Sequence, residues 1–101
     1  MIAYNITTKI DWTIADEWLQ WQQLDHIPEI MRTKLFDTHK IFRLLDQDDT
    51  EGPTFIIQYF TSSIKNYNLY IENFAPALRI VAINKWGDRF ISFRTLMEVV
   101  N

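Results

Sequence analysis

The stretch FISFRTLMEV, residues 90–99, decides the fold, because it predicts a β-strand that is apolar on both faces. Successive side chains of a strand point to opposite sides of its sheet. Both alternating sets here carry apolar residues: Ile91, Phe93, Met97 and Val99 in one, and Phe90 and Leu96 in the other. The segment 54–61, TFIIQYFT, shows the same pattern. A sheet with helices on one side and water on the other alternates cleanly, so we expect both faces to be covered.

The composition is typical of one globular domain, residues 1–101, with 48% hydrophobic and 15% aromatic residues. The chain has no cysteine, which excludes disulfides, thiol catalysis and cysteine metal sites. Its net charge of −3 argues against nucleic acid as a partner. No segment approaches the roughly 18 apolar residues of a membrane helix. The opening residues also lack a basic signal-peptide start, so we expect a cytoplasmic protein.

Hydrophobic periodicity predicts strands and helices in the order βαββαβ: a strand over 1–10, a helix from Thr13 to about His26, strands over 36–46 and 54–61, a long helix from Ser63 to Trp86, and a strand over 90–100. Pro28 disfavours helical conformation at Ile27, so we expect the first helix to break there. Pro28 can then open a short second helix, to Thr33. Pro76 is expected to break or kink the long helix near Ala75.

Two split βαβ units with right-handed crossovers predict an α+β, ferredoxin-like fold. Its sheet is antiparallel and four-stranded, in the order 4-1-3-2, with the helices on one face. The chain has no further element to cover the other face. We therefore expect a homodimer in which sheet packs against sheet.

Four segments resemble one known family: MIAYNITT (1–8), DEWLQWQQLDHIPEIMRTKLF (16–36), FIIQYF (55–60) and WGDRFISFRTLMEVVN (86–101). It is a small bacterial family of uncharacterised proteins, a domain of unknown function similar to the dimeric α/β-barrel (ferredoxin-like) superfamily. The resemblance implies this fold and a dimer, but no activity. The superfamily includes cofactor-free monooxygenases, haem-binding proteins, isomerases and regulatory dimers, and a fold does not choose among them. No catalytic residue is carried over.

His26 is the strongest single candidate for chemistry. It falls within the apolar arc of the first helix, with Gln22, and lies at the expected break before Pro28. One interpretation makes it an acid, a base or a ligand in a pocket between helix and sheet. The interpretation that we favour is a structural histidine, bonded to carbonyls freed at the helix end. A functional pocket would be lined by Trp18, Gln22, His26, Tyr59, Tyr67 and Trp86.

Four polar residues interrupt the strands near their middles: Asn5, Arg43, Gln58 and Arg94. If the more polar alternating sets share a face, they form a band across the sheet, away from the helices. The band would then fix the register of a dimer, with both guanidinium groups paired. The alternative is a site for an anion or carboxylate. We favour the interface role.

The remaining motifs argue against a metal or a cofactor. His26 and His39 have no third ligand in sequence, and the acidic turn 46–51 has Glu51 where a calcium-binding EF-hand loop needs glycine. No catalytic constellation is complete. We therefore favour a regulatory or interaction homodimer. The alternative is a cofactor-independent enzyme or small-molecule binder, monooxygenase- or isomerase-like, with its pocket near His26. A cavity at His26 would favour the alternative, and a filled core would favour the first hypothesis.

Overall fold

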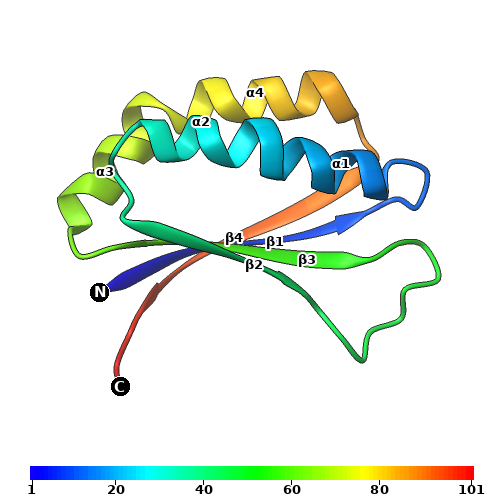
Figure 1. The fold of residues 1–101 in the computed structure, drawn as a ribbon, viewed down its shortest axis with the longest axis horizontal. Helices are drawn as coiled ribbons and strands as arrows, with labels where there is room; N and C mark the ends of the chain where they lie inside the picture. The colour runs from blue at the N-terminus through cyan, green and yellow to red at the C-terminus, as the bar shows by residue number, and fades with distance from the viewer.

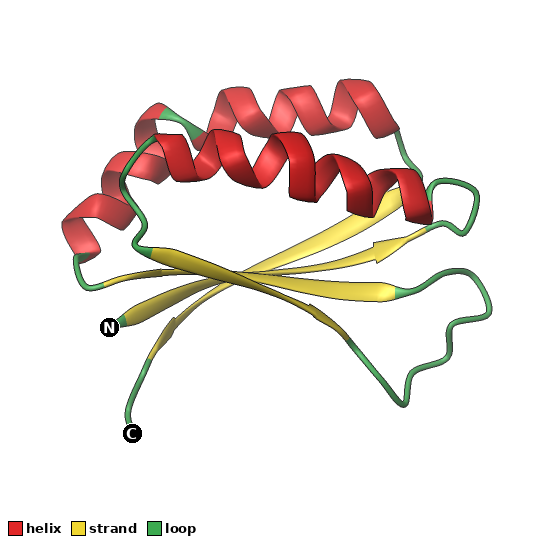
Figure 2. Cartoon of the chain, viewed as in Figure 1, coloured by secondary structure: helices red, strands yellow, loops and turns green.

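The computed structural model describes residues 1–101 and contains one antiparallel sheet (Figure 1). Its strands are β1 (Ile2–Ile10), β2 (Thr38–Arg43), β3 (Thr54–Thr61) and β4 (Phe90–Glu98). They lie in the order β2-β3-β1-β4, which is the predicted order read from the opposite edge. The helices all lie on one face of the sheet (Figure 2): α1 (Ala15–Trp21), α2 (Ile27–Arg32), α3 (Ile64–Asn73) and α4 (Ala75–Trp86). The predicted ferredoxin-like fold is confirmed.

An aromatic cluster fills the space between sheet and helices. The Tyr4 ring of β1 lies 6.4 Å from the ring of Tyr59 on β3 and 5.4 Å from the ring of Tyr67 on α3. Phe36 and Tyr70 pack their rings edge to face at 5.1 Å beside them. Large buried rings of this kind dominate core energetics. Around Tyr4 and Tyr59, the helix-facing side of the central strands β1 and β3 is therefore a packed core.

The first helical region does not break before Pro28, and this prediction is wrong. A π-helical turn, η1 (Gln22–His26), joins α1 to α2, and the Ile27 N–H donates to the Gln22 carbonyl. Pro28 cannot donate to the Leu24 carbonyl, and its ring would crowd that carbonyl in a regular α-helix. The wider turn relieves this crowding while Ile27 keeps helical backbone angles. His26 is half-buried, as predicted.

The second helical region divides as predicted. The Ser63 side chain caps α3 by accepting the Asn66 N–H at 3.1 Å. Phe74, with a φ of −121°, separates α3 from α4, one residue before the expected position. Gly87 ends α4 at a positive φ of 65°. None of the helices has the length and apolar character that a membrane span requires.

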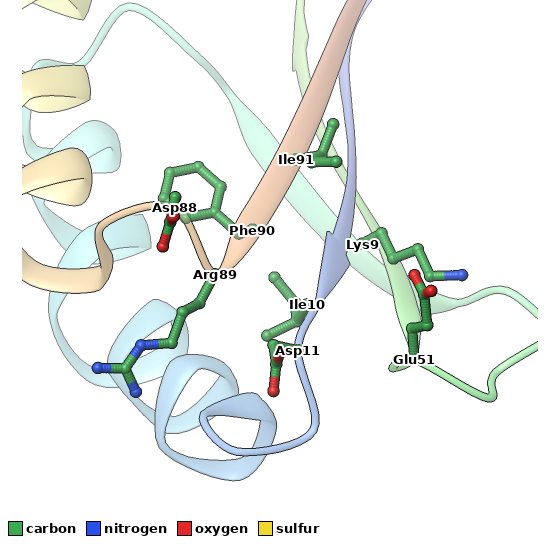
Figure 3. A pocket seen from close by; sticks show the side chains of 8 residues that line it. All are labelled: Lys9, Ile10, Asp11, Glu51, Asp88, Arg89, Phe90 and Ile91. Atoms are coloured by element: carbon green, nitrogen blue, oxygen red, sulfur yellow. The ribbon is translucent and has the colours of Figure 1, made fainter.

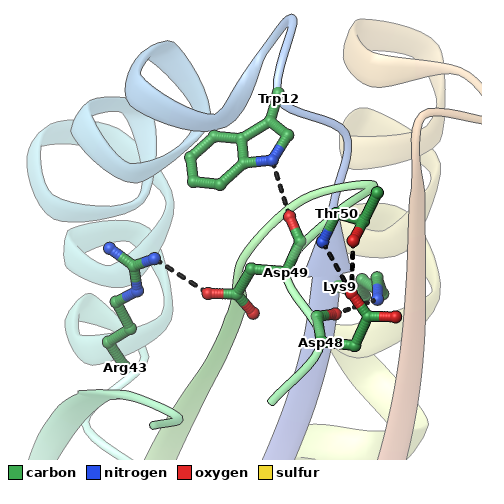
Figure 4. Close-up of polar contacts among 6 residues, drawn as sticks. All are labelled: Lys9, Trp12, Arg43, Asp48, Asp49 and Thr50. Atoms are coloured by element: carbon green, nitrogen blue, oxygen red, sulfur yellow. Dashed lines mark hydrogen bonds and ion pairs between the residues drawn. The ribbon is translucent and has the colours of Figure 1, made fainter. Parts of the chain in front are cut away.

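The loop between β2 and β3 is held against the start of the first helical region (Figure 4). Trp12 Nε1 donates to the Asp49 carbonyl at 2.7 Å, and Arg43 forms an ion pair with Asp49 at 2.9 Å. A Cβ on Gly52 would lie 1.6 Å from the Ile10 carbonyl oxygen, so only glycine fits there. β2 ends at Arg43, three residues earlier than predicted, and the loop begins there.

Candidate functional site

The strand register decides which side chains face the helices. Ile6 on β1 pairs with Arg94 on β4, and Phe55 on β3 pairs with Arg43 on β2. Directly paired residues share a face. Because Phe55 packs on Trp18 of α1, with ring centroids 5.7 Å apart, this is the helix-covered face. The prediction that both arginines lie on the opposite face is therefore wrong.

The error has a local cause, which the edge strand β4 shows. In β1 and β3 the apolar alternating set faces the helices, as expected. In β4 the apolar set, which includes Ile91 and Phe93, faces away, and Ser92 and Arg94 face the helices. Hydrophobicity alone therefore predicts the wrong orientation of this strand, because no element of the chain packs on its apolar side.

The predicted polar band reduces to two residues on the open face. Asn5 and Gln58 are cross-strand partners, and Gln58 Nε2 donates to Asn5 Oδ1 at 3.1 Å. Asn5 Nδ2 in turn donates to Thr7 Oγ1 at 3.1 Å. Their position on the face away from the helices agrees with the sequence analysis. Their role in an interface stays a prediction.

A cavity of about 40 Å³ lies between the middle of the sheet, η1 and α4. Its lining combines apolar and polar residues: Ile6, Thr8, Trp18, Gln22, His26, Ile57, Tyr59, Ala82, Phe90, Ser92 and Arg94. One water-sized group needs roughly 10–15 Å³, so this volume of about 40 Å³ holds about three of them. Because the π-helical turn places both Gln22 and His26 on the lining, the irregularity at Pro28 helps to build the cavity.

Four of the six residues predicted for the pocket line this cavity, namely Trp18, Gln22, His26 and Tyr59. Tyr67 does not, because its ring packs on Tyr4. Trp86 does not either, and its ring packs edge to face on Trp21, with ring centroids 5.7 Å apart. The sequence analysis missed the lining residues from β1 and β4, which only the strand register identifies.

Two polar atoms at the cavity are buried without a hydrogen-bond partner, the Tyr59 hydroxyl and Gln22 Oε1. Tyr59 is 0% exposed and Gln22 is 6% exposed. Leaving such a group unpaired costs roughly 1–3 kcal/mol. The neighbouring hydroxyls of Thr8 and Ser92 bond to each other at 2.9 Å. The lining residues therefore include one hydroxyl and one amide oxygen without a partner in the chain.

His26 is the titratable imidazole of the cavity. Burial lowers its pKa to about 4, the Arg94 guanidinium contributes in the same direction, and Glu29 opposes them. The imidazole is therefore neutral at pH 7, and it stacks on the Trp21 ring at 4.5 Å. Burial also raises the pKa of the Tyr59 hydroxyl, which keeps its proton. Arg94 is then the one charged group on the lining.

A wider depression of about 140 Å³ lies at the end of the sheet, where β1 ends and β4 begins (Figure 3). Lys9 and Glu51 stand on one side of it, and Asp88 and Arg89 on the other. These four charged side chains are solvent-facing or partly so, and no buried polar atom there lacks a partner. We therefore place the candidate site at the smaller cavity, where two buried groups are free. The structure brings no three His, Asp or Glu side chains together as a metal-binding group.

Comparison with protein families gives one assignment. The model of a domain of unknown function (DUF4286) matches residues 1–100. None of the curated proteins matches the sequence.

Several solved structures share the fold at low sequence identity. A mutant of SnoaB, a cofactor-independent oxygenase from Streptomyces nogalater, superposes with a TM-score of 0.69 at 10% identity, over 99% of this chain and 94% of that chain. An antibiotic biosynthesis monooxygenase gives 0.67 at 15% identity, over 100% of both chains. A dimeric ferredoxin-like protein from an uncultured marine organism gives 0.67 at 12% identity, over 100% and 96%. At these identities the likeness shows the fold and no activity.

Proposed function

The chain belongs to the DUF4286 family of domains of unknown function, and from this premise we propose that it is a homodimer that binds a small molecule in the cavity beside His26. One observation carries the proposal. The Tyr59 hydroxyl and Gln22 Oε1 are buried without partners, and both residues line this cavity. Buried polar groups are paired in most native structures, and an unpaired one at a cavity calls for a guest molecule or an ordered water.

The open face of the sheet supports the dimer. It exposes large apolar side chains from both edge strands: Phe42 of β2, and Ile91, Phe93 and Met97 of β4. Phe93 is 68% exposed and Ile91 is 60% exposed. A contiguous apolar patch on a protein surface marks an interaction site. A second copy of the sheet offers a matching apolar surface, and two of the structural neighbours are described as dimeric.

Binding is favoured over catalysis by the state of His26. A general base works best when its pKa lies near the working pH, and the pKa of His26 is about 4. The Tyr59 hydroxyl keeps its proton, and no carboxylate lines the cavity. These residues can orient a ligand but are poorly suited to remove a proton from it. The monooxygenase-like alternative therefore rests on fold similarity alone.

The presence of a cavity also bears on the first hypothesis, a dimer with an interaction role only. That hypothesis predicts a filled core beside His26, but the core contains a cavity there. The proposal invokes no cofactor and no nucleic acid. It places the dimer in the cytoplasm, as the sequence predicts.

Native mass spectrometry of the protein purified from its own host tests the proposal. We expect a species of twice the 12.1 kDa chain mass that carries a small-molecule adduct. The adduct should be absent from a Gln22→Leu variant, which removes the free acceptor at the cavity. A dimer whose adduct survives Gln22→Leu would place the ligand elsewhere, and a monomer would contradict the assembly.

A further inference from the structure

Resting on the proposed function, we infer that the ligand of this cavity is a small hydroxycarboxylic acid, whose carboxylate binds Arg94 and the Tyr59 hydroxyl and whose own hydroxyl donates to Gln22 Oε1. Three features of the cavity support this ligand: the charge of its lining, the direction of its free hydrogen bonds, and its volume.

The charge of the lining favours an anion. Arg94 is its one charged residue, and no Asp or Glu lines the cavity. No hydrogen bond or ion pair within the chain engages the Arg94 guanidinium. Arg43, the other arginine of the helix-facing side, is by contrast paired with Asp49 and lies over the Trp12 ring. A free guanidinium presents a planar fork of donors that matches a carboxylate.

A ligand that pairs both free hydrogen-bonding groups must carry an acceptor and a donor. The Tyr59 hydroxyl is a donor, since its pKa is raised and it keeps its proton. Gln22 Oε1 is an acceptor only. A carboxylate satisfies Tyr59 and Arg94 but cannot satisfy Gln22. A hydroxyl on the same small molecule completes the set.

The volume limits the ligand to a short acid. About 40 Å³ accommodates a carboxylate-sized group and little more. Arg94 lines the cavity and is itself exposed, so it stands between the cavity and solvent. A ligand can thus place its polar head inside and extend a few atoms past Arg94. Bulky polycyclic molecules do not fit without movement of η1 or α4.

Binding of an acid should be coupled to His26. The charged groups that influence its imidazole are Arg94 from β4, which disfavours protonation, and Glu29 from α2, which favours it. Asp25 is its neighbour in η1. A carboxylate placed beside Arg94 offsets the positive charge there, so it raises the pKa of His26. By reciprocity, the acid binds more tightly as the pH falls towards that pKa.

The test compares three probes by NMR titration of the dimer at pH 7, namely lactate, its neutral analogue lactamide, and propionate, which lacks the hydroxyl. We expect lactate to bind at least about tenfold more tightly than either analogue. In Arg94→Met the preference for lactate over lactamide should disappear. Arg43→Met is the matched control, since Arg43 shares the helix-facing side but lies away from the cavity, and it should keep the preference. The His26 imidazole resonances should titrate about one pH unit higher with lactate bound.

Each contrary outcome has a definite meaning. Equal binding of lactate and lactamide, or a preference that survives Arg94→Met, would overturn the assignment of an anion while leaving a cavity ligand in place. Equal binding of lactate and propionate would overturn the assignment of the hydroxyl. If none of the probes binds but the protein from its host carries the adduct, the inference fails and the proposed function stands. If the adduct is also absent, both fail.

Discussion

The two sides of strand β4 reverse the usual relation between hydrophobicity and burial. Under the helices, β4 presents Ser92 and Arg94 beside a small cavity. On the open face the same strand presents Ile91 and Phe93 to solvent. Each side of β4 therefore lacks a partner within the chain. The apolar side chains on the open face have no apolar surface packed against them. The polar side chains at the cavity include groups that have no polar partner within the chain.

The largest effect is expected on the open face, from Phe93→Asp. In a twofold sheet-to-sheet dimer this change buries two unpaired carboxylates, so the dissociation constant should rise more than about thousandfold, or roughly 4 kcal/mol. Sedimentation velocity across a micromolar concentration series measures it. Leu45→Asp, at a 74% exposed residue beyond the end of β2, is the control and should leave the dimer intact. A Phe93→Asp variant that stays dimeric would show that the open face is not the interface.

A smaller effect is expected on the covered side, in the dependence of stability on pH. The pKa of His26 is about 4 in the folded state, below the ordinary value of 6.5. The unfolded chain therefore binds more protons between these values, so the stabilisation is present above pH 6.5 and is lost as the pH falls to about 4. Because His26 is only half-buried, we expect a loss of about 2 kcal/mol between pH 7 and pH 4.5.

Urea unfolding at fixed protein concentration measures this loss of stability. His26→Gln should flatten the dependence on pH over this range. His39→Gln, at an exposed imidazole on β2, should keep the wild-type slope. An unchanged slope in His26→Gln would remove His26 as its source.

The smallest effect separates two buried tyrosines on the covered face. Tyr59→Phe removes a hydroxyl that has no partner, so the free energy of unfolding should stay the same or rise by up to about 1 kcal/mol. Tyr4→Phe removes a hydroxyl that accepts from Arg79 Nη2 at 3.1 Å, and should lower it by about 1 kcal/mol. Chemical denaturation of the two variants without ligand measures the contrast. Equal losses in both would mean that the Tyr59 hydroxyl has a partner in the folded protein.

The architecture follows from the sequence because its signals are local. Strand alternation, the Ser63 cap and the breaks at Pro76 and Gly87 each act within a few residues, and they give the order of elements and of strands. The predicted break before Pro28 is wrong because packing of the helix outweighs the local preference of Ile27. A π-helical turn accommodates the proline without ending the helix.

The candidate site was predicted only in part, because it depends on strand register. Trp18, Gln22 and His26 share one helical face, so their spacing alone places them together. Arg94 and Ser92 join them only because β4 pairs with β1 in a register that turns its polar set towards the helices. Hydrophobicity favours the opposite assignment, because the local pattern of β4 does not show which of its faces the helices cover.

We infer that the open face of the sheet packs against a second copy of this chain. Isotope-filtered NOE measurements on a mixture of labelled and unlabelled protein test it most directly, because they detect only contacts between chains. We predict contacts between chains from Ile91, Phe93 and Met97 of the open face. The outer side of α4 also exposes apolar residues, including Ile80 and Ile83. Contacts between chains from α4, with none from the open face, would contradict the account.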